Sequence, residues 1–370
     1  MKWDIEEIRA KRDKLKSMIS NELDKDSKEI IVSSYFAYDG MLFNSGSIRY
    51  THFYNAINIL TFNKFHLVKE KEKREIFLST FDNDGVKFEL DFINQLFEIF
   101  KGVLSNKYDM TPTIFSRAYF TKDKLIDVSK DFYRQLDLEL YSNVLRILDP
   151  KNKTMNFNNS NYTNDGINVF GRTFYDNYHD KVYCTVRCDR TYIDLISTAH
   201  ELMHANQYFY NNKLLQYRFP YVGEIEPKVI ELLMLDYLID NGYDQLEIEK
   251  IKVWRNQQLV YSSYLIVDYV KRAREKNMLQ DVNYVNSDFV MASMTALTSL
   301  VAYYIYKEIK INKQVGINKL KKVMKEPIMM DEQPKFDFIG LDFNELLEIA
   351  KNITKISVEN NKEMKYNINR

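Results

Sequence analysis

The residues of this sequence best suited to chemistry are two histidines four positions apart with a glutamate between them. The motif consists of His200, Glu201 and His204 in the run Ser-Thr-Ala-His-Glu-Leu-Met-His-Ala. On a helix, side chains at positions i and i+4 share one face about 6 Å apart, so both imidazoles can bind one zinc ion. Glu201 can reach a water molecule in the open coordination position, where a general base acts. The spacing therefore predicts a hydrolytic zinc site.

This motif is specific in a chain with so few histidines. The sequence has five His in 370 residues, so the pattern is expected by chance on the order of 0.005 times per chain. Apolar residues at helical spacing surround it, which predicts that the motif lies on a helix. The alternative is a core helix whose two histidines only hydrogen-bond to their neighbours.

A catalytic zinc site needs a third protein ligand. No histidine follows His204, so a downstream carboxylate is expected unless an upstream histidine returns to the site. The upstream histidines are His52, His66 and His179. The candidate carboxylates are Glu224, Glu226 and Glu231.

The spacing of these glutamates suggests a division of roles. Glu224 and Glu231 are seven residues apart, two turns on one helix face. We expect Glu224 to bind the metal and Glu231 to accept the second ring N–H of a ligating histidine, which fixes its tautomer. Glu226 would point away. Each glutamate could instead be an exposed carboxylate near a helix start, where the helix dipole favours it.

The composition predicts that helices position these residues. Gly (10) and Pro (6) together make 16 of 370 residues, about 4%, against roughly 12% in average usage. A chain so poor in turn-forming residues is expected to consist of long helices. The periodicity predicts helices over residues 4–24, 48–80, 86–104 and 122–148, with a break at Asp39-Gly40.

A change in amino-acid composition separates two regions. Residues 149–166 are rich in Pro, Asn and Ser and predict a loop. The β-branched and aromatic stretches 169–170 and 182–186 predict a small β-sheet just before the motif helix. The expected fold is mainly α, with a helical N-terminal lobe over 1–150 and a catalytic region that carries the zinc motif over 165–370. These parts are expected either as two lobes around a cleft or as one continuous domain.

The charge balance and the one long uncharged segment indicate which classes of partner are not expected. Lys+Arg and Asp+Glu are both 52, so the net charge is zero and neither nucleic acid nor an anionic membrane is an expected partner. Residues 289–306 carry no charge but include several Ser and Thr, which favours a buried core helix over a membrane span. The N-terminus lacks the apolar stretch of a secretory signal, and Cys184 and Cys188 are expected as reduced thiols. These features predict a cytosolic protein.

Three segments together resemble oligoendopeptidase F and its thimet oligopeptidase relatives, a family of zinc metallopeptidases. They are the motif run at 197–205, the Glu224-Ile pair with a second glutamate seven positions later, and the Phe-Gly-Arg-Thr-Phe-Tyr run at 170–175. The resemblance covers residues 165–235 and extends more weakly to about residue 355.

The resemblance implies roles for individual residues. The zinc ligands would be His200, His204 and Glu224, and Glu201 would activate water. Residues 182–186 would form the edge strand along which an extended peptide pairs. The chain departs from the family in having Met203 before the second histidine.

A second departure concerns stabilisation of the reaction intermediate. The family carries a late-helix histidine and tyrosines that donate hydrogen bonds to the intermediate, whereas the corresponding stretch here, residues 289–296, has neither. Tyr303, Tyr304 and Tyr306 lie one to two turns later. They could substitute, although aromatic residues on a helix are more often core.

We therefore expect a zinc metallopeptidase that binds one zinc ion and hydrolyses short unstructured peptides. No oligomeric state is assigned from the sequence. One alternative is an HExxH protease specific for a single protein substrate, as clostridial neurotoxin light chains are with a similar motif. The other is a non-catalytic peptide-binding relative, which the missing late histidine makes plausible.

Overall fold

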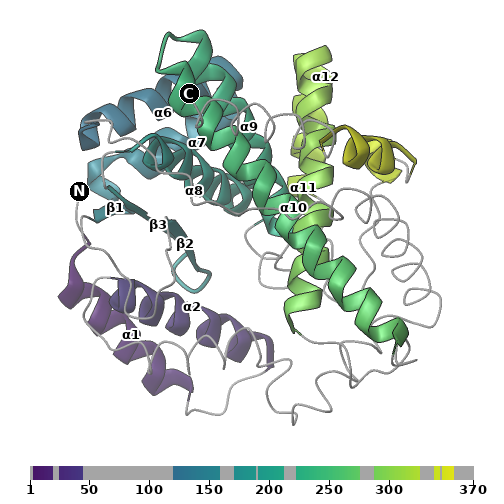
Figure 1. The fold of residues 1–370 in the computed structure, drawn as a ribbon. Coiled ribbons are helices and arrows are strands. Elements are labelled where there is room, and N and C mark those ends of the chain that lie inside the picture. The colour runs from purple at the N-terminus through teal and green to yellow at the C-terminus, as the bar shows by residue number, and fades with distance from the viewer. Residues whose placement is uncertain are drawn as a thin grey trace. The chain divides into compact units, whose positions relative to one another are not determined.

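A computed structural model gives the fold of this chain (Figure 1). It describes residues 3–19, 25–44, 120–158, 171–188, 191–211, 222–275, 287–325, 337–341 and 344–353. The predicted helices at 48–80 and 86–104 and the predicted strand at 169–170 lie outside the described residues. The described part is mainly helical with one small sheet, which confirms the predicted fold class.

The described elements group into two compact units. The first contains the sheet and the helices before residue 212, and the second contains the helices from residue 222 onward. Helix α7 (Leu138–Leu148), which precedes the expected division at 150–165, packs on α8 (Tyr192–Asn211), the helix that carries the motif.

The first unit begins with a pair of helices, α1 (Ile5–Ile19) and α2 (Lys25–Asn44). The predicted break at Asp39-Gly40 is wrong, because α2 continues through it. Asp39 is buried there, and its Oδ1 lies 3.2 Å from Nη1 of Arg12 on α1. This ion pair between the two helices gives the buried carboxylate a partner within a continuous helix.

The predicted helix at 122–148 is two helices, α6 (Lys122–Leu136) and α7. Asp137 separates them in an extended conformation with φ −162° and ψ 133°. Its carboxylate accepts hydrogen bonds from the backbone N–H groups of Glu139 and Leu140, both at 3.0 Å. Asp137 therefore caps a new helix, a role that Asp favours over a place inside a helix.

The sheet has three strands, β1 (Met155–Asn158), β2 (Gly171–Asp176) and β3 (Lys181–Arg187), in the order β1-β3-β2. Strand β1 lies within the predicted loop at 149–166 and pairs parallel to β3, with Met155 opposite Cys184. The short helical turn η1 (Pro150–Asn152) precedes it. Because β3 is the central strand, the expectation that residues 182–186 form the edge strand is wrong.

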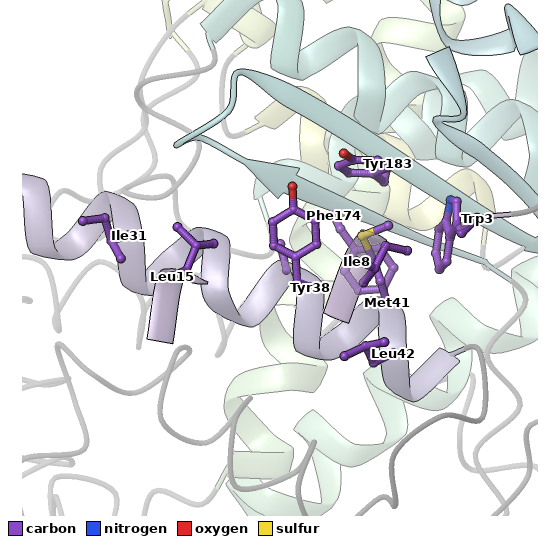
Figure 2. Close-up of a cluster of buried hydrophobic side chains, with 10 residues drawn as sticks. Trp3, Ile8, Leu15, Ile31, Tyr38, Met41, Leu42, Phe174 and Tyr183 are labelled. Atoms are coloured by element: carbon purple, nitrogen blue, oxygen red, sulfur yellow. The ribbon is translucent and has the colours of Figure 1, made fainter. Parts of the chain in front are cut away.

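The two faces of the sheet pack against different helices. Side chains alternate along a strand, so Phe174 and Asp176 of β2 point to one face and Thr173 and Tyr175 to the other. On the first face Phe174 meets Trp3, with ring centroids 6.0 Å apart. Figure 2 shows this core, in which side chains of α1 and α2 pack against the sheet. The second face carries α8.

The second unit is a bundle of helices. It contains the turn η2 (Val222–Glu224), α9 (Ile225–Asp240), α10 (Gln245–Glu275), α11 (Ser287–Ile311), α12 (Lys313–Lys325) and the turn η4 (Asp337–Ile339). Residues 344–353 are also helical.

Helix α11 occupies the position of a core helix in this unit. It contacts α9, α10 and α12, and its side chains Leu300, Val301 and Ile305 are fully buried. The prediction that residues 289–306 belong to a buried helix is therefore confirmed over the side chains described. None of the described helices combines the length and the apolar character needed to cross a membrane.

Candidate active site

Helix α8 carries the histidine motif and is held around this motif by side chains of its own unit. The hydroxyl of Tyr133 on α6 donates to the carbonyl of Ala199 at 2.7 Å. The hydroxyl of Tyr175 on β2 donates to the carbonyl of His204 at 3.3 Å. Contacts to the carbonyl just before the motif and to that of its last residue fix the position of α8 against the sheet and α6.

The two histidines of the motif face each other. Nε2 of His200 and Nε2 of His204 lie 3.1 Å apart, and both side chains are half-buried. Two nitrogen ligands of a tetrahedral zinc ion lie about 3.3 Å apart, given Zn–N distances of about 2.0–2.1 Å. The separation of the two imidazole nitrogens therefore fits a shared zinc ion.

The other ring nitrogen of His204 has an acceptor beside it. Nδ1 of His204 lies 3.0 Å from Oε1 of Gln207, which is almost fully buried on the same helix. An acceptor at Nδ1 favours the tautomer that carries its proton there, which leaves the lone pair of Nε2 free to bind metal. Sequence reasoning gave this orienting role to Glu231 and missed Gln207, although its spacing of three residues from His204 was available as a signal.

Glu201 lies at the interface of α8 with the sheet and is only 5% exposed. Its Oε2 accepts a hydrogen bond of 2.7 Å from the hydroxyl of Thr173. The same hydroxyl lies 3.1 Å from the backbone carbonyl oxygen of Glu201, and the thiol of Cys184 lies 3.6 Å from that carbonyl oxygen. One side chain each from strands β2 and β3 thus contacts the predicted general base.

Gly171 makes room for this carboxylate. A Cβ atom at position 171 would lie 2.5 Å from Cγ and 2.7 Å from Oε1 of Glu201. Real side chains do not approach this closely, so only glycine fits here without a shift of Glu201. Gly171 and Thr173 were not singled out as site residues from the sequence, because nothing local connects them to a glutamate about 30 positions later.

The three candidate carboxylates for the third ligand lie in the second unit. Glu224 is half-buried at the end of η2, directly before α9. One turn later, Nζ of Lys228 donates to Oγ1 of Thr298 at 3.0 Å and to Oγ of Ser299 at 2.9 Å, which ties α9 to α11. Burial lowers the pKa of Lys228 to about 8, against the opposing effect of the Glu224 charge. These contacts fix the first turns of α9, from which Glu224 extends.

Glu231 forms an ion pair with Arg255 of α10 in the same unit. Burial lowers the pKa of this arginine to about 10. Glu226 is fully buried on α9. The predicted roles of Glu224 as ligand and of Glu231 as partner of a ligating histidine stay predictions.

The late tyrosines bind partners within the second unit. Tyr303 donates to Oδ1 of Asn256 at 2.6 Å, and Tyr306 donates to Oδ2 of Asp236 at 2.6 Å. The hydroxyl of Tyr304 lies 3.2 Å from the carbonyl oxygen of Ile339. These bonds join α11 to neighbouring elements, as expected of core residues.

His179 was a possible upstream ligand. It lies in the turn between β2 and β3, where its Nδ1 is 2.9 Å from Oδ2 of the fully buried Asp176. The hydroxyl of Tyr38 on α2 donates to the same carboxylate. This cluster joins the hairpin to α2. His52 and His66 lie outside the described residues.

Comparison with solved structures identifies the fold. A Bacillus anthracis protein assigned as an oligoendopeptidase F superposes with a TM-score of 0.53 at 13% identity, over 98% of this chain and 75% of that one. PZ peptidase A with an inhibitor gives a TM-score of 0.57 at 11% identity, over 93% of this chain and 71% of that one.

The fold is that of oligoendopeptidase F-like peptidases. A Chlamydophila abortus protein assigned as a peptidase has a similar fold, with a TM-score of 0.51 at 14% identity. The superposition covers 91% of this chain and 62% of that one. No protein-family model matches the sequence, and no curated protein matches it by sequence. At these identities the fold is what the chains share.

Proposed function

We propose that this chain is a zinc-dependent metallopeptidase that hydrolyses short unstructured peptides. The observation that carries the proposal is the pair of Nε2 atoms 3.1 Å apart on α8, with Glu201 between the two histidines in sequence. This arrangement suits one zinc ion, and the fold is one found in peptidases.

The residues that would hold zinc are His200, His204 and Glu224. Two imidazole nitrogens and one carboxylate oxygen leave one coordination position open, as catalytic zinc sites require. When bound, zinc lowers the pKa of water to about 7 and polarises the scissile carbonyl group. Glu224 enters this proposal from its spacing and from the resemblance to the oligoendopeptidase family.

Glu201 would act as the general base. Its carboxylate takes a proton from the attacking water molecule and later returns it to the leaving amine. Gln207 would keep Nε2 of His204 unprotonated for the metal, and Thr173 binds one oxygen of the Glu201 carboxylate. We also propose peptide as the partner and the cytosol as the location.

The test is cleavage of a mixture of short peptides, followed by mass spectrometry, with wild type and Glu201→Gln. We expect wild type to cleave peptides and Glu201→Gln to lose about 10²- to 10⁴-fold in kcat while keeping its zinc. Glu6→Gln, the same change at an exposed carboxylate on α1, is the control and should behave as wild type. Unchanged turnover by Glu201→Gln would contradict the proposal.

Both alternatives predict that short peptides stay intact, and further measurements distinguish them. A protease specific for one protein would leave short peptides intact and cut a full-length protein. A non-catalytic peptide-binding relative would contain one zinc ion per chain, bind peptides and cleave none.

A further inference from the structure

We propose that strand β2 positions Glu201 for catalysis, with Thr173 as the positioning residue that holds one carboxylate oxygen and Gly171 as the position that makes room for the other. This inference rests on the proposed function, in which Glu201 is the general base. It adds two residues of the strand to the machinery of the motif helix.

Thr173 contacts both the side chain and the main chain of Glu201. Its Oγ1 lies 2.7 Å from Oε2 and 3.1 Å from the backbone carbonyl oxygen. Hydrogen bonds to a charged acceptor are stronger than those between neutral groups. The carboxylate is therefore held in one orientation relative to the backbone of α8, which is what a base needs in order to meet the attacking water at a fixed place.

Gly171 determines where the second oxygen lies. Oε1 of Glu201 rests over the bare Cα of Gly171, 2.7 Å from the point that a Cβ would occupy. Among the residues that the structure describes, no donor is hydrogen-bonded to Oε1 of Glu201. With Oε2 held by Thr173, Oε1 is the oxygen left to accept the proton.

The alternation of side chains along β2 gives both residues this role. Positions 171, 173 and 175 share the face toward α8, and the hydroxyl of Tyr175 binds the carbonyl of His204 on that same face. The strand therefore contacts the motif helix at Glu201 and again at His204. Thr185 of β3 pairs with Arg172 on the opposite face, where its hydroxyl lies 3.4 Å from Nδ2 of Asn156.

The kinetic test compares four variants of the full chain loaded with zinc. Thr173→Val is expected to lower kcat about 10- to 100-fold, the effect of losing a hydrogen bond to a charged group, with KM changed less than about threefold. Thr173→Ser keeps the hydroxyl and should stay within about threefold of wild type. Gly171→Ala should lower kcat as well. Thr185→Val, the same change on the opposite face, is the matched control and should leave kcat unchanged.

Crystal structures of wild type, Thr173→Val and Thr173→Ser give a readout that does not depend on turnover. We expect Oε2 of Glu201 within hydrogen-bonding distance of residue 173 in wild type and in the Ser variant, and displaced in the Val variant. A Glu201 side chain that stays in place in Thr173→Val, or equal losses of kcat in the Ser and Val variants, would overturn the inference. If wild type cleaves no peptide, the proposed function fails, and the crystal structures still decide whether Thr173 positions Glu201.

Discussion

Oε1 of Gln207 lies 3.0 Å from Nδ1 of His204, one helical turn away on α8. This contact orients the imidazole so that its Nε2 faces Nε2 of His200. Partners of this kind raise metal affinity by holding the ligand in the correct tautomer and rotation.

Replacing Gln207 with Leu removes that acceptor. We expect zinc affinity to fall about 10- to 100-fold, measured by competition with a chromophoric chelator. Gln207→Glu keeps an acceptor oxygen and serves as the control, with affinity close to that of wild type. Equal affinities for wild type and Gln207→Leu would show that Gln207 has no part in orienting His204.

The hydroxyl of the fully buried Tyr133 donates to the carbonyl of Ala199, one residue before the motif. Tyr133→Phe should lower the free energy of unfolding by about 0.5–1.5 kcal/mol, the usual contribution of one hydrogen bond. Urea denaturation measures this change. Tyr141→Phe, on α7 of the same unit, is the control, since no hydrogen bond joins its hydroxyl to a described residue. A loss no larger than that of the control would mean that the Tyr133 bond does not stabilise α8.

Asp236 gives the second unit a stability that depends on pH. Burial alone would raise its pKa, but hydrogen bonds from Tyr306 and Lys310 and the charge of Lys252 outweigh burial and hold the pKa below its ordinary value of 3.8. A lowered folded-state pKa stabilises the fold above the unfolded pKa, and this contribution is lost as the pH falls through the folded pKa.

The variant Asp236→Asn should therefore unfold more easily than wild type at pH 7, by about 1–3 kcal/mol. Below about pH 3.8 the difference should shrink, because the Asp236 carboxylate of wild type is protonated first in the unfolded state and then, at its lower pKa, in the folded state. Urea midpoints at pH 7 and pH 3 test this expectation. A difference that stays constant between the two pH values would contradict it.

The two cysteines should differ in reactivity. Neither forms a disulfide; Cys184 is fully buried and Cys188 is half-buried. Burial raises the pKa of the Cys184 thiol, so the reactive thiolate is scarcer there. At pH 8 a chromogenic thiol reagent should modify Cys188 first and Cys184 only after unfolding in urea. Rapid modification of both thiols in the native protein would be inconsistent with the buried position of Cys184.

The part of the site that could be predicted from the sequence is the part with local spacing. His200 and His204 meet because a helix places positions i and i+4 together. The contacts of Glu201 with Gly171 and Thr173 depend instead on how β2 packs against α8. This packing joins residues far apart in the sequence, so it cannot be predicted from the periodicity of either segment. Gln207 also has a local signal in its three-residue spacing from His204, whereas the seven-residue spacing of Glu224 and Glu231 predicts Glu231 for the orienting role.

The fold shows the same contrast. Low Gly and Pro content correctly indicated long helices. Strand β1 was missed because Met155 and Phe157 pair with a strand nearly 30 residues later, and four residues are too few to give a pattern of their own. Periodicity alone predicts one helix through Asp137, because the capping role of Asp137 depends on the extended backbone that it adopts in the structure.

The most direct test of the central claim is the zinc stoichiometry of the purified chain after dialysis, measured by mass spectrometry of the metal. We predict one zinc ion per chain in wild type and in Glu201→Gln, and loss of stoichiometric zinc in His204→Ala and in Glu224→Ala. A wild-type chain that binds no zinc when the metal is supplied, or a His204→Ala variant that keeps a full equivalent, would contradict the account.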